Sequence, residues 1–233
     1  MHDPEVPGTL AADSDFTAIE KQGLYRAIYE RRDIRGEFLP DPIPDSIVQK
    51  LLDAAHHAGS VGFMQPWNFI IINDEATKRK VKSIFETENI VAAQNYEGAK
   101  KKKYQSLKLE GILEAPINLC VTCDRSRHGP HVVGRNTILD TDLYSTCCAI
   151  QNLWLAARAE GIGVGWVSII DNDALKQLLN IPTEIVAVAY LAIGFVAKFP
   201  SRPLLEEVGW QPRIPLEPLI FQNRWDQPWQ QKS

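Results

Sequence analysis

The residues best suited to chemistry form a short basic cluster, with one further arginine far along the chain. The cluster consists of Arg31, Arg32, Asp33, Ile34 and Arg35, and the distant residue is Arg202, between two prolines. A guanidinium offers a planar fork of donors that suits a phosphate monoester. Surface ion pairing is the ordinary alternative for such arginines. On the residues alone, a phosphate site and a salt-bridged surface both remain open.

Two cysteines and two histidines also lie close together, at Cys120, Cys123, His128 and His131. These residue types bind zinc, but the gap between the second cysteine and the first histidine is far shorter than in a zinc finger. The cysteines are an odd number of residues apart within an apolar stretch, so they would point to opposite faces of a strand. Buried thiols and a polar loop are therefore favoured over a metal site.

The glycine-rich stretch 161–165 does not fit a dinucleotide-binding fingerprint. Trp166 stands where the third glycine is required, and no helix follows at once. The lysine run 100–103 indicates a solvated helix face, with a phosphate-facing lid as the alternative.

Four segments, in this order, resemble the signatures of the nitroreductase superfamily. They are Arg31 to Arg35, Ser60 to Asn68 around Gln-Pro-Trp, Glu160 to Ser168, and Pro200 to Pro203. The resemblance spans about residues 20–210. It implies an α+β fold with a central mixed β-sheet flanked by helices, and it implies bound FMN. It also implies a homodimer with exchanged C-terminal segments and flavin sites at the subunit interface.

The resemblance further implies which residues hold FMN. Arg31, Arg35 and Arg202 would bind the phosphate, with Arg32 nearby. Residues along the ribityl chain and the ring would include a glycine, which lets the backbone approach closely. The full implied binding set is Arg31, Arg32, Asp33, Ile34, Arg35, Ser60, Gly62, Asn68, Ser168 and Arg202.

Departures from the general pattern of the superfamily point to one branch of it. Asp33 stands where a serine is usual, and Ser168-Ile169 stands where a Glu-Gly pair is common. Gly59, Ser60 and Phe63 also replace the usual residues before Gln-Pro-Trp. These features resemble a flavin-destroying branch, in which reduced FMN is the substrate and O2 the co-substrate. The implied reaction passes through a C4a-peroxide and yields a benzimidazole and a tetrose phosphate.

Within that branch, Asp33 and Ser168 are the catalytic candidates. Asp33 would transfer a proton near the ribityl C1′ carbon, since a carboxylate replaces a hydroxyl there. Ser168 would present its N–H and hydroxyl near N5 and C4a and orient the peroxide. The alternative for Asp33 is a structural ion pair with Arg32 or Arg35.

Three competing functions remain. One is an NAD(P)H-dependent nitroreductase or quinone reductase that keeps its flavin, another is a dehalogenase of the same superfamily, and the third is a non-catalytic flavin-binding dimer. The sequence contains no recognisable nicotinamide site, so we expect a separate flavin reductase to supply reduced FMN.

Hydrophobic spacing predicts the elements that must position these residues. Helices are expected over 21–30, about 46–58, most of 75–111, 140–160 and 173–179, and strands over 67–72, 117–122, near 161–168 and over 184–196. The 140–160 segment has the strongest helical pattern, with Leu143, Cys147, Ile150 and Trp154 on one face and Cys147-Cys148 expected in the core. The resemblance implies that this is the central helix of the dimer.

The expected domain organisation is one domain with additions. Residues 1–18 form a loose arm, 19–210 form the FMN domain, and 211–233 form a tail that packs on the domain or on the partner subunit. Polar residues at about 89–108 would form a lid over the flavin, where excluded water protects a peroxide.

Composition excludes several other classes of protein. The chain has 233 residues, a formal net charge of −4 and 45% hydrophobic residues, which argues against nucleic-acid binding and against disorder. The longest apolar run, 185–197, is shorter than the ~20 residues that a bilayer requires. The start of the chain lacks the basic and apolar regions of a signal peptide. We therefore expect a cytoplasmic protein with reduced thiols.

Overall fold

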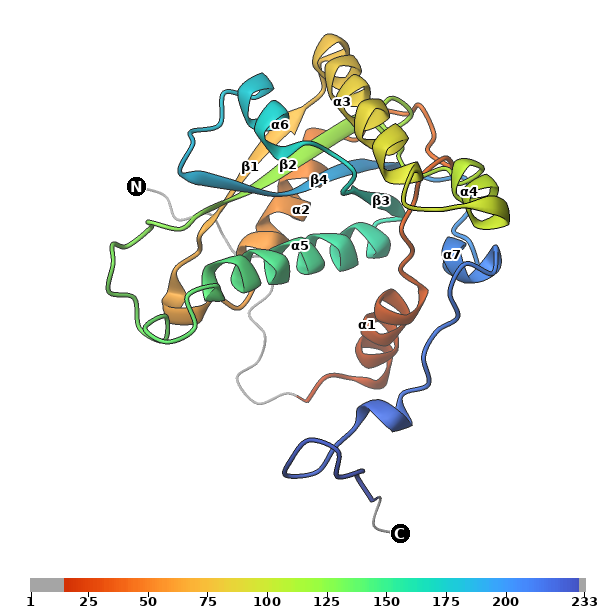
Figure 1. Ribbon diagram of the computed structural model, residues 1–233. Coiled ribbons are helices and arrows are strands. Elements are labelled where there is room, and N and C mark those ends of the chain that lie inside the picture. Colours follow the sequence, from red (N-terminus) through yellow and green to blue (C-terminus); the bar gives the residue numbers. More distant parts are fainter. Residues whose placement is uncertain (1–14, 231–233) are drawn as a thin grey trace. The chain divides into compact units, whose positions relative to one another are not determined.

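The structure is a computed structural model that describes residues 15–230 and falls into two compact units, 1–199 and 200–233 (Figure 1). Most of the expected arm, residues 1–14, lies outside the described residues. The sheet and the helices that cover it belong to the first unit.

The centre of the first unit is a four-stranded sheet in the order β1-β2-β4-β3. Its strands are β1 (Trp67–Ile72), β2 (Ile117–Asp124), β3 (Ile162–Val167) and β4 (Ile185–Phe195). All three strand pairs are antiparallel. Within the described residues, parallel pairing is limited to an isolated bridge between Asp33 and Val164. The predicted α+β class is confirmed, whereas the four described strands form an antiparallel sheet and not the expected mixed one.

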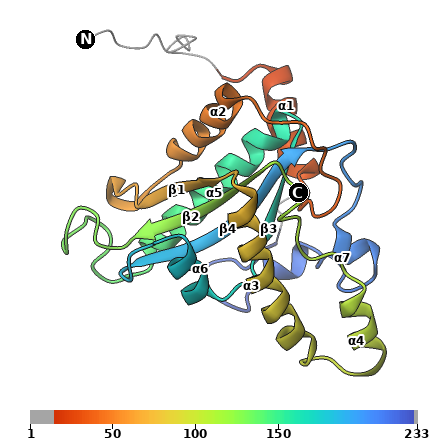
Figure 2. The same cartoon turned by 90° about the horizontal axis from the view of Figure 1, so that it is seen from above.

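Helices cover both faces of the sheet (Figure 2). The helices of this unit are α1 (Ala18–Glu30), α2 (Asp45–His56), α3 (Glu75–Ala93), α4 (Gly98–Gln105), α5 (Thr141–Ala159) and α6 (Asn172–Leu178), with a short 3-10 helix η1 (Val61–Phe63). Side chains of α2 and α5 pack on one face of the sheet and form one core. Side chains of α3 and α6 pack on the other face and form a second core. These elements lie where the hydrophobic spacing predicts them.

Helix α5 buries only part of its predicted apolar face, at Ile150 and Trp154. Ala149, Ile150 and Leu153 are buried, whereas Cys147 and Cys148 are exposed. The expectation that these two cysteines lie in the core is therefore wrong for the single chain. Small and hydroxyl-bearing residues, which the apolar pattern ignores, form part of the buried face of α5.

Helix α1 begins three residues earlier than predicted, because Thr17 and Glu20 form a reciprocal capping box at its start. No residue of α1 is buried. Leu24, Tyr25 and Tyr29 are all more than half exposed. Within the described residues of this unit, the apolar side of the helix is therefore largely exposed.

The second unit consists of short elements and turns. It contains α7 (Leu204–Glu207), the 3-10 helix η2 (Glu217–Leu219) and a bridge between Phe221 and Pro228. The rings of Phe221 and Trp225 lie 4.8 Å apart, and Trp225 is 79% exposed. Across residues 15–230, no helix combines the length and apolar character needed to cross a membrane.

Candidate functional site

Asp33 lies beside β3, and both of its carboxylate oxygens have a partner. Oδ1 accepts a hydrogen bond of 2.9 Å from the backbone N–H of Trp166, and Oδ2 lies 2.5 Å from Nη2 of Arg35. Desolvation raises the pKa of the Asp33 carboxyl, and it outweighs the opposite effects of Arg35 and of the Trp166 N–H. The side chain is still 41% exposed. Asp33 is thus a carboxylate with a raised pKa that a ligand can reach.

Arg35 is the more buried partner of this pair. Its Nη2 also donates to the Trp166 carbonyl at 2.5 Å. Its Nη1 is buried and finds no hydrogen-bond partner in the part of the chain that the structure describes. Burial lowers the pKa of Arg35, while the charge of Asp33 opposes that shift. A buried guanidinium nitrogen without a partner fits an anionic ligand such as a phosphate.

The glycines of β3 explain why the segment around Asp33 lies so close to this strand. The Ile34 N–H donates to the Val164 carbonyl at 3.1 Å. A Cβ on Gly165 would lie 2.0 Å from the Ile34 carbonyl oxygen, and a Cβ on Gly163 would lie 2.8 Å from Cγ1 of Ile34. The glycine-rich stretch therefore provides room for the segment around Asp33, and it forms no dinucleotide fingerprint.

Arg31 and Arg32 lie at the end of α1 and contact α5. The Arg31 guanidinium stacks over the Trp154 ring at 4.6 Å, and Trp154 Nε1 donates to the Arg32 carbonyl at 3.3 Å. Nη1 of Arg32 donates to the Tyr29 carbonyl at 2.8 Å. The structure therefore joins the basic cluster to the C-terminal half of α5.

Ser168 directly follows β3 and is exposed. It lines a cavity of about 110 Å³ together with residues of β4 and α6. Tyr190, another lining residue, has a buried hydroxyl with no partner among the described residues. The structure brings Ser168 to the end of β3 that also carries Trp166, the partner of Asp33.

Ser60 and Gly62 lie in a tight loop before β1. The Ser60 Oγ accepts a hydrogen bond of 2.8 Å from the Gln65 N–H. Gly62 has a φ of 58°, and a Cβ there would lie 2.5 Å from both Cγ1 of Val132 and the carbonyl oxygen of Val133. Glycine is therefore required at position 62 both by the backbone conformation and by the neighbouring loop.

Asn68 lies on β1, and both the nitrogen and the oxygen of its side-chain amide form hydrogen bonds. Nδ2 donates to Thr122 Oγ1 at 3.3 Å, and Oδ1 accepts from Nη2 of Arg127 at 2.5 Å. Sequence reasoning missed Arg127, because it belongs to no recognised motif and contacts Asn68 from a distant loop.

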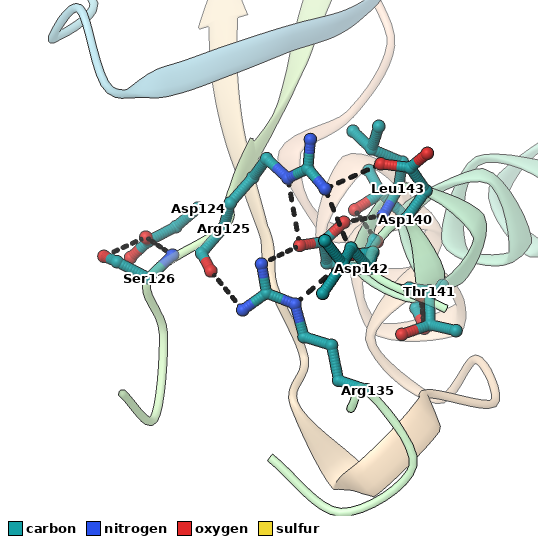
Figure 3. A network of polar contacts seen from close by, with 11 residues as sticks. Asp124, Arg125, Ser126, Arg135, Asp140, Thr141, Asp142 and Leu143 are labelled. Atoms are coloured by element: carbon teal, nitrogen blue, oxygen red, sulfur yellow. Dashed lines mark hydrogen bonds and ion pairs between the residues drawn. The ribbon is translucent and has the colours of Figure 1, made fainter. Parts of the chain in front are cut away.

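The loop that carries Arg127 is fixed to the start of α5 by a network of ion pairs (Figure 3). Asp142, whose side chain is 1% exposed, lies 3.1 Å from Nε of Arg125 and 2.9 Å from Nη2 of Arg135. Arg135 Nη1 also donates to the Arg125 carbonyl at 2.7 Å. The sequence places three arginines between Asp124 and Asp140, which could have indicated an ion-pair network, although not its partners.

The predicted site residues therefore form two groups, one around Asp33 and one around Ser60. The two groups contact different parts of α5. The loop around Ser60 meets its first half, since the Val61 N–H donates to Ser145 Oγ at 3.2 Å. The Asp33 group meets its second half, through Trp154. Nine residues of helix correspond to roughly 14 Å along its axis. Within the described residues, the two groups therefore contact α5 at separate positions along its axis.

Arg202 lies in the second unit, in a bend just before α7. Its meeting with Arg31 and Arg35 at one phosphate stays a prediction.

The cysteine and histidine spacing has a structural explanation. Cys120 is buried among the side chains on the α3 face of the sheet, and burial raises the pKa of its thiol to about 12. Cys123 is also buried, and burial raises the pKa of its thiol. Between residues 15 and 230, no three His, Cys, Asp or Glu side chains are grouped so that they could hold a metal ion.

Comparison with known proteins identifies the family. A model described as the nitroreductase family matches residues 28–195. The chain therefore belongs to the nitroreductase family, and the predicted membership is confirmed.

Individual relatives refine this assignment. The chain is 41% identical over 195 residues to a protein of Rhodospirillum rubrum named 5,6-dimethylbenzimidazole synthase, covering 84% of this chain and 92% of that protein. It is 37% identical over 203 residues to a protein of the same name from Rhodobacter capsulatus, covering 87% and 98%. These relatives confirm the prediction of an oxidoreductase enzyme that resembles this group of synthases.

Solved structures show the same fold. A crystal structure of iodotyrosine deiodinase bound to FMN and 3-iodo-L-tyrosine matches with a TM-score of 0.64 at 24% identity. The match covers 77% of this chain and 94% of that one.

Proposed function

We propose that this protein consumes reduced FMN and O2 and produces 5,6-dimethylbenzimidazole and erythrose 4-phosphate. The observation that carries the proposal is the Asp33 carboxylate, fixed by Arg35 and by the Trp166 N–H at the end of the strand that leads to Ser168. The two synthase relatives, at 41% and 37% identity over most of the chain, support the same reaction.

The basic cluster would bind the FMN phosphate. Nη1 of Arg35 is buried without a partner among the described residues, which suits an anionic oxygen. Arg31 and Arg32 lie at the end of α1 in the same basic cluster, and Arg202 is proposed as a further ligand of the phosphate. Bound reduced FMN supplies both the electrons that reduce O2 and the carbon atoms of the benzimidazole.

Asp33 would transfer a proton near the ribityl C1′ carbon. Its raised pKa brings the carboxyl closer to the pH at which it can both accept and release a proton. Arg35 and the Trp166 N–H hold both oxygens, so the carboxylate needs little reorganisation. Ser168 would orient the reacting oxygen through its hydroxyl and N–H, at the exposed end of β3.

The complete site would need two copies of the chain. Ser60 and Asp33 belong to groups at different parts of α5, and both groups are proposed to contact one flavin. Helix α1 leaves Leu24 and Tyr25 exposed, which suits burial against another subunit. We propose a homodimer in which each flavin is held by the Asp33 group of one chain and the Ser60 group of the other.

A separate flavin reductase is proposed as the source of reduced FMN. Residues 89–108, which form the end of α3 and all of α4, would cover the bound flavin and exclude water.

The fate of the flavin tests the proposed function. The protein is mixed with FMN, reduced without oxygen and then exposed to air, and the products are identified by mass spectrometry. We expect dimethylbenzimidazole and erythrose 4-phosphate in equal amounts, with a matching loss of FMN. Quantitative recovery of intact FMN would contradict the proposal and favour a reductase or a flavin-binding dimer.

A further inference from the structure

The end of β2 and the loop that follows it form hydrogen bonds with the segment that leads into β1. Three consecutive carbonyls of that segment, those of Gln65, Pro66 and Trp67, all accept hydrogen bonds from residues 124–127. The Arg127 guanidinium donates to the Gln65 and Trp67 carbonyls at 2.5 and 3.0 Å, and the Asp124 N–H donates to the Pro66 carbonyl at 2.7 Å. One arginine and one backbone N–H therefore satisfy the whole run.

Arg127 also fixes a side chain of the site. Its Nη2 donates to Oδ1 of Asn68 at 2.5 Å, which determines the orientation of that amide and turns Nδ2 toward Thr122. The guanidinium places its donors on separate nitrogens of a rigid plane, so Nη1 bonds the two carbonyls while Nη2 bonds the amide oxygen. A lysine has its three donors on a single nitrogen and does not reproduce this geometry.

The Ser60–Asn68 segment has an unfavourable backbone conformation at two positions. Phe63 has a φ of 53° and Gln65 a φ of 47°. Residues with a side chain avoid this left-handed region, because the Cβ crowds the backbone there. The conformation therefore needs support from outside the segment, and Arg127 supplies it at Gln65.

The loop that carries Arg127 is itself anchored. Arg125 and Arg135 both pair with Asp142, whose side chain is 1% exposed, at the start of α5 (Figure 3). Val132 and Val133 of the same loop touch Gly62. The loop is thus held in place on one side and contacts the Ser60–Asn68 segment on the other.

We infer that Arg127 is a positioning residue for the flavin site, which fixes Asn68 and the Gln65–Trp67 carbonyls so that the Ser60–Asn68 segment can receive FMN. The inference rests on the proposed function, because it assumes that this segment contacts the flavin. Arg127 affects FMN binding indirectly, by holding the Ser60–Asn68 segment in position.

The test compares Arg127→Met with the matched variant Arg79→Met. Arg79 is 65% exposed on α3 and pairs with Glu75, so it controls for the loss of one guanidinium. For each protein, the Kd for FMN is measured by fluorescence titration well below the melting temperature of the FMN-free protein. We expect Arg127→Met to weaken FMN binding about tenfold or more, since misplaced binding groups lose affinity steeply. Arg79→Met is expected to bind like the wild type.

Two further variants separate positioning from a merely structural role. Arg127→Lys keeps the charge but loses the fork, and we expect it to recover part of the affinity. In an Asn68→Ala background, the effect of Arg127→Met is expected to shrink, because the two residues act together. If Arg127→Met does not fold, Arg127→Lys measured against the wild type decides the question.

The outcomes are distinct. An unchanged Kd for FMN in Arg127→Met, with only a lower melting temperature, would overturn the inference and leave the proposed function intact. A wild-type protein that does not bind FMN would overturn both.

Discussion

At the scale of single residues, Asp33 is the decisive test of the chemistry. Asparagine keeps an oxygen that can accept from the Trp166 N–H, but it has no charge and cannot accept a proton. We expect Asp33→Asn to bind FMN within a few-fold of the wild type and to form less than about 1% of the benzimidazole, in line with the loss of a proton-transfer group. Titration with FMN and product analysis after reaction with air measure the two properties separately.

Asp53→Asn is a suitable control, because Asp53 is an exposed carboxylate on α2 that lies near His57. Benzimidazole formation by Asp33→Asn at the rate of the control would leave Asp33 with only the structural ion-pair role.

Glu110 provides a prediction about pH and stability. Its side chain is 3% exposed and accepts hydrogen bonds of 2.6 Å from both Lys82 and Lys108. Burial alone would raise the pKa of this carboxyl, but the two lysines and the Ile112 N–H together lower it below its ordinary value. The unfolded chain therefore binds the proton more readily than the folded protein.

The stabilisation from Glu110 is thus complete above the ordinary carboxyl pKa of 4.5 and is lost as pH falls through the lower folded value. We expect Glu110→Gln to show a flatter decline of the free energy of unfolding at acid pH than the wild type. Urea denaturation at several pH values between ~3 and ~7 measures this decline. Glu114→Gln, which removes the more exposed partner of Lys108, serves as the control, and identical acid slopes for all three proteins would refute the prediction.

At the scale of elements, the packing of β3 against the Asp33 segment depends on glycine. A Cβ at position 165 would lie 2.0 Å from the Ile34 carbonyl oxygen and 2.7 Å from Nη1 of Arg35. We expect Gly165→Ala to lower the free energy of unfolding by about 1–3 kcal/mol, as overpacking does, and to weaken FMN binding because Arg35 must move. Gly59→Ala, where a Cβ meets nothing within 4 Å, should be close to neutral in both assays. Chemical denaturation and FMN titration compare the two.

The proposed lid is a second element that can be tested. The Tyr104 hydroxyl donates to Asn89 Oδ1 at 2.7 Å, and its ring stacks on Tyr96 at 4.9 Å, so these contacts join α4 to the end of α3. The lysine run 100–103 offers trypsin sites on α4. We expect reduced FMN, added without oxygen, to slow cleavage there several-fold, because closure over the flavin orders the segment. Equal cleavage with and without the flavin would argue against a lid.

How much the sequence could predict also differs between elements. The sequence predicts strand β1 with its observed bounds, because a short stretch rich in apolar and β-branched residues is a local signal. It predicts the buried face of α5 only in part, at Ile150 and Trp154, because small and hydroxyl-bearing residues also contribute to that face. The contact between Asp33 and Trp166 joins positions 133 residues apart, and Arg127 reaches Asn68 across 59. No local pattern encodes such pairs, so the sequence predicts neither contact: it indicates Asp33 only through its motif and does not indicate Arg127.

At the scale of the whole molecule, the separation of the two residue groups along α5 predicts complementation between subunits. Asp33→Asn and Ser60→Glu would each inactivate their own homodimer, at different halves of the site. When the two proteins are unfolded together and refolded as a mixture, half of the dimers are mixed, and each mixed dimer has one intact site. We therefore expect about a quarter of wild-type activity in the mixture. No recovery, in a mixture shown by mass spectrometry to contain mixed dimers, would contradict a site shared between two chains.

The absence of any buried residue in α1 has a consequence for how the protein melts. A helix of 13 residues is only marginally stable in water without tertiary packing. In the proposed dimer, the stability of α1 therefore depends on the association of the two chains. The melting temperature should rise with protein concentration, and on dilution helicity should be lost from α1 before the four-stranded sheet unfolds.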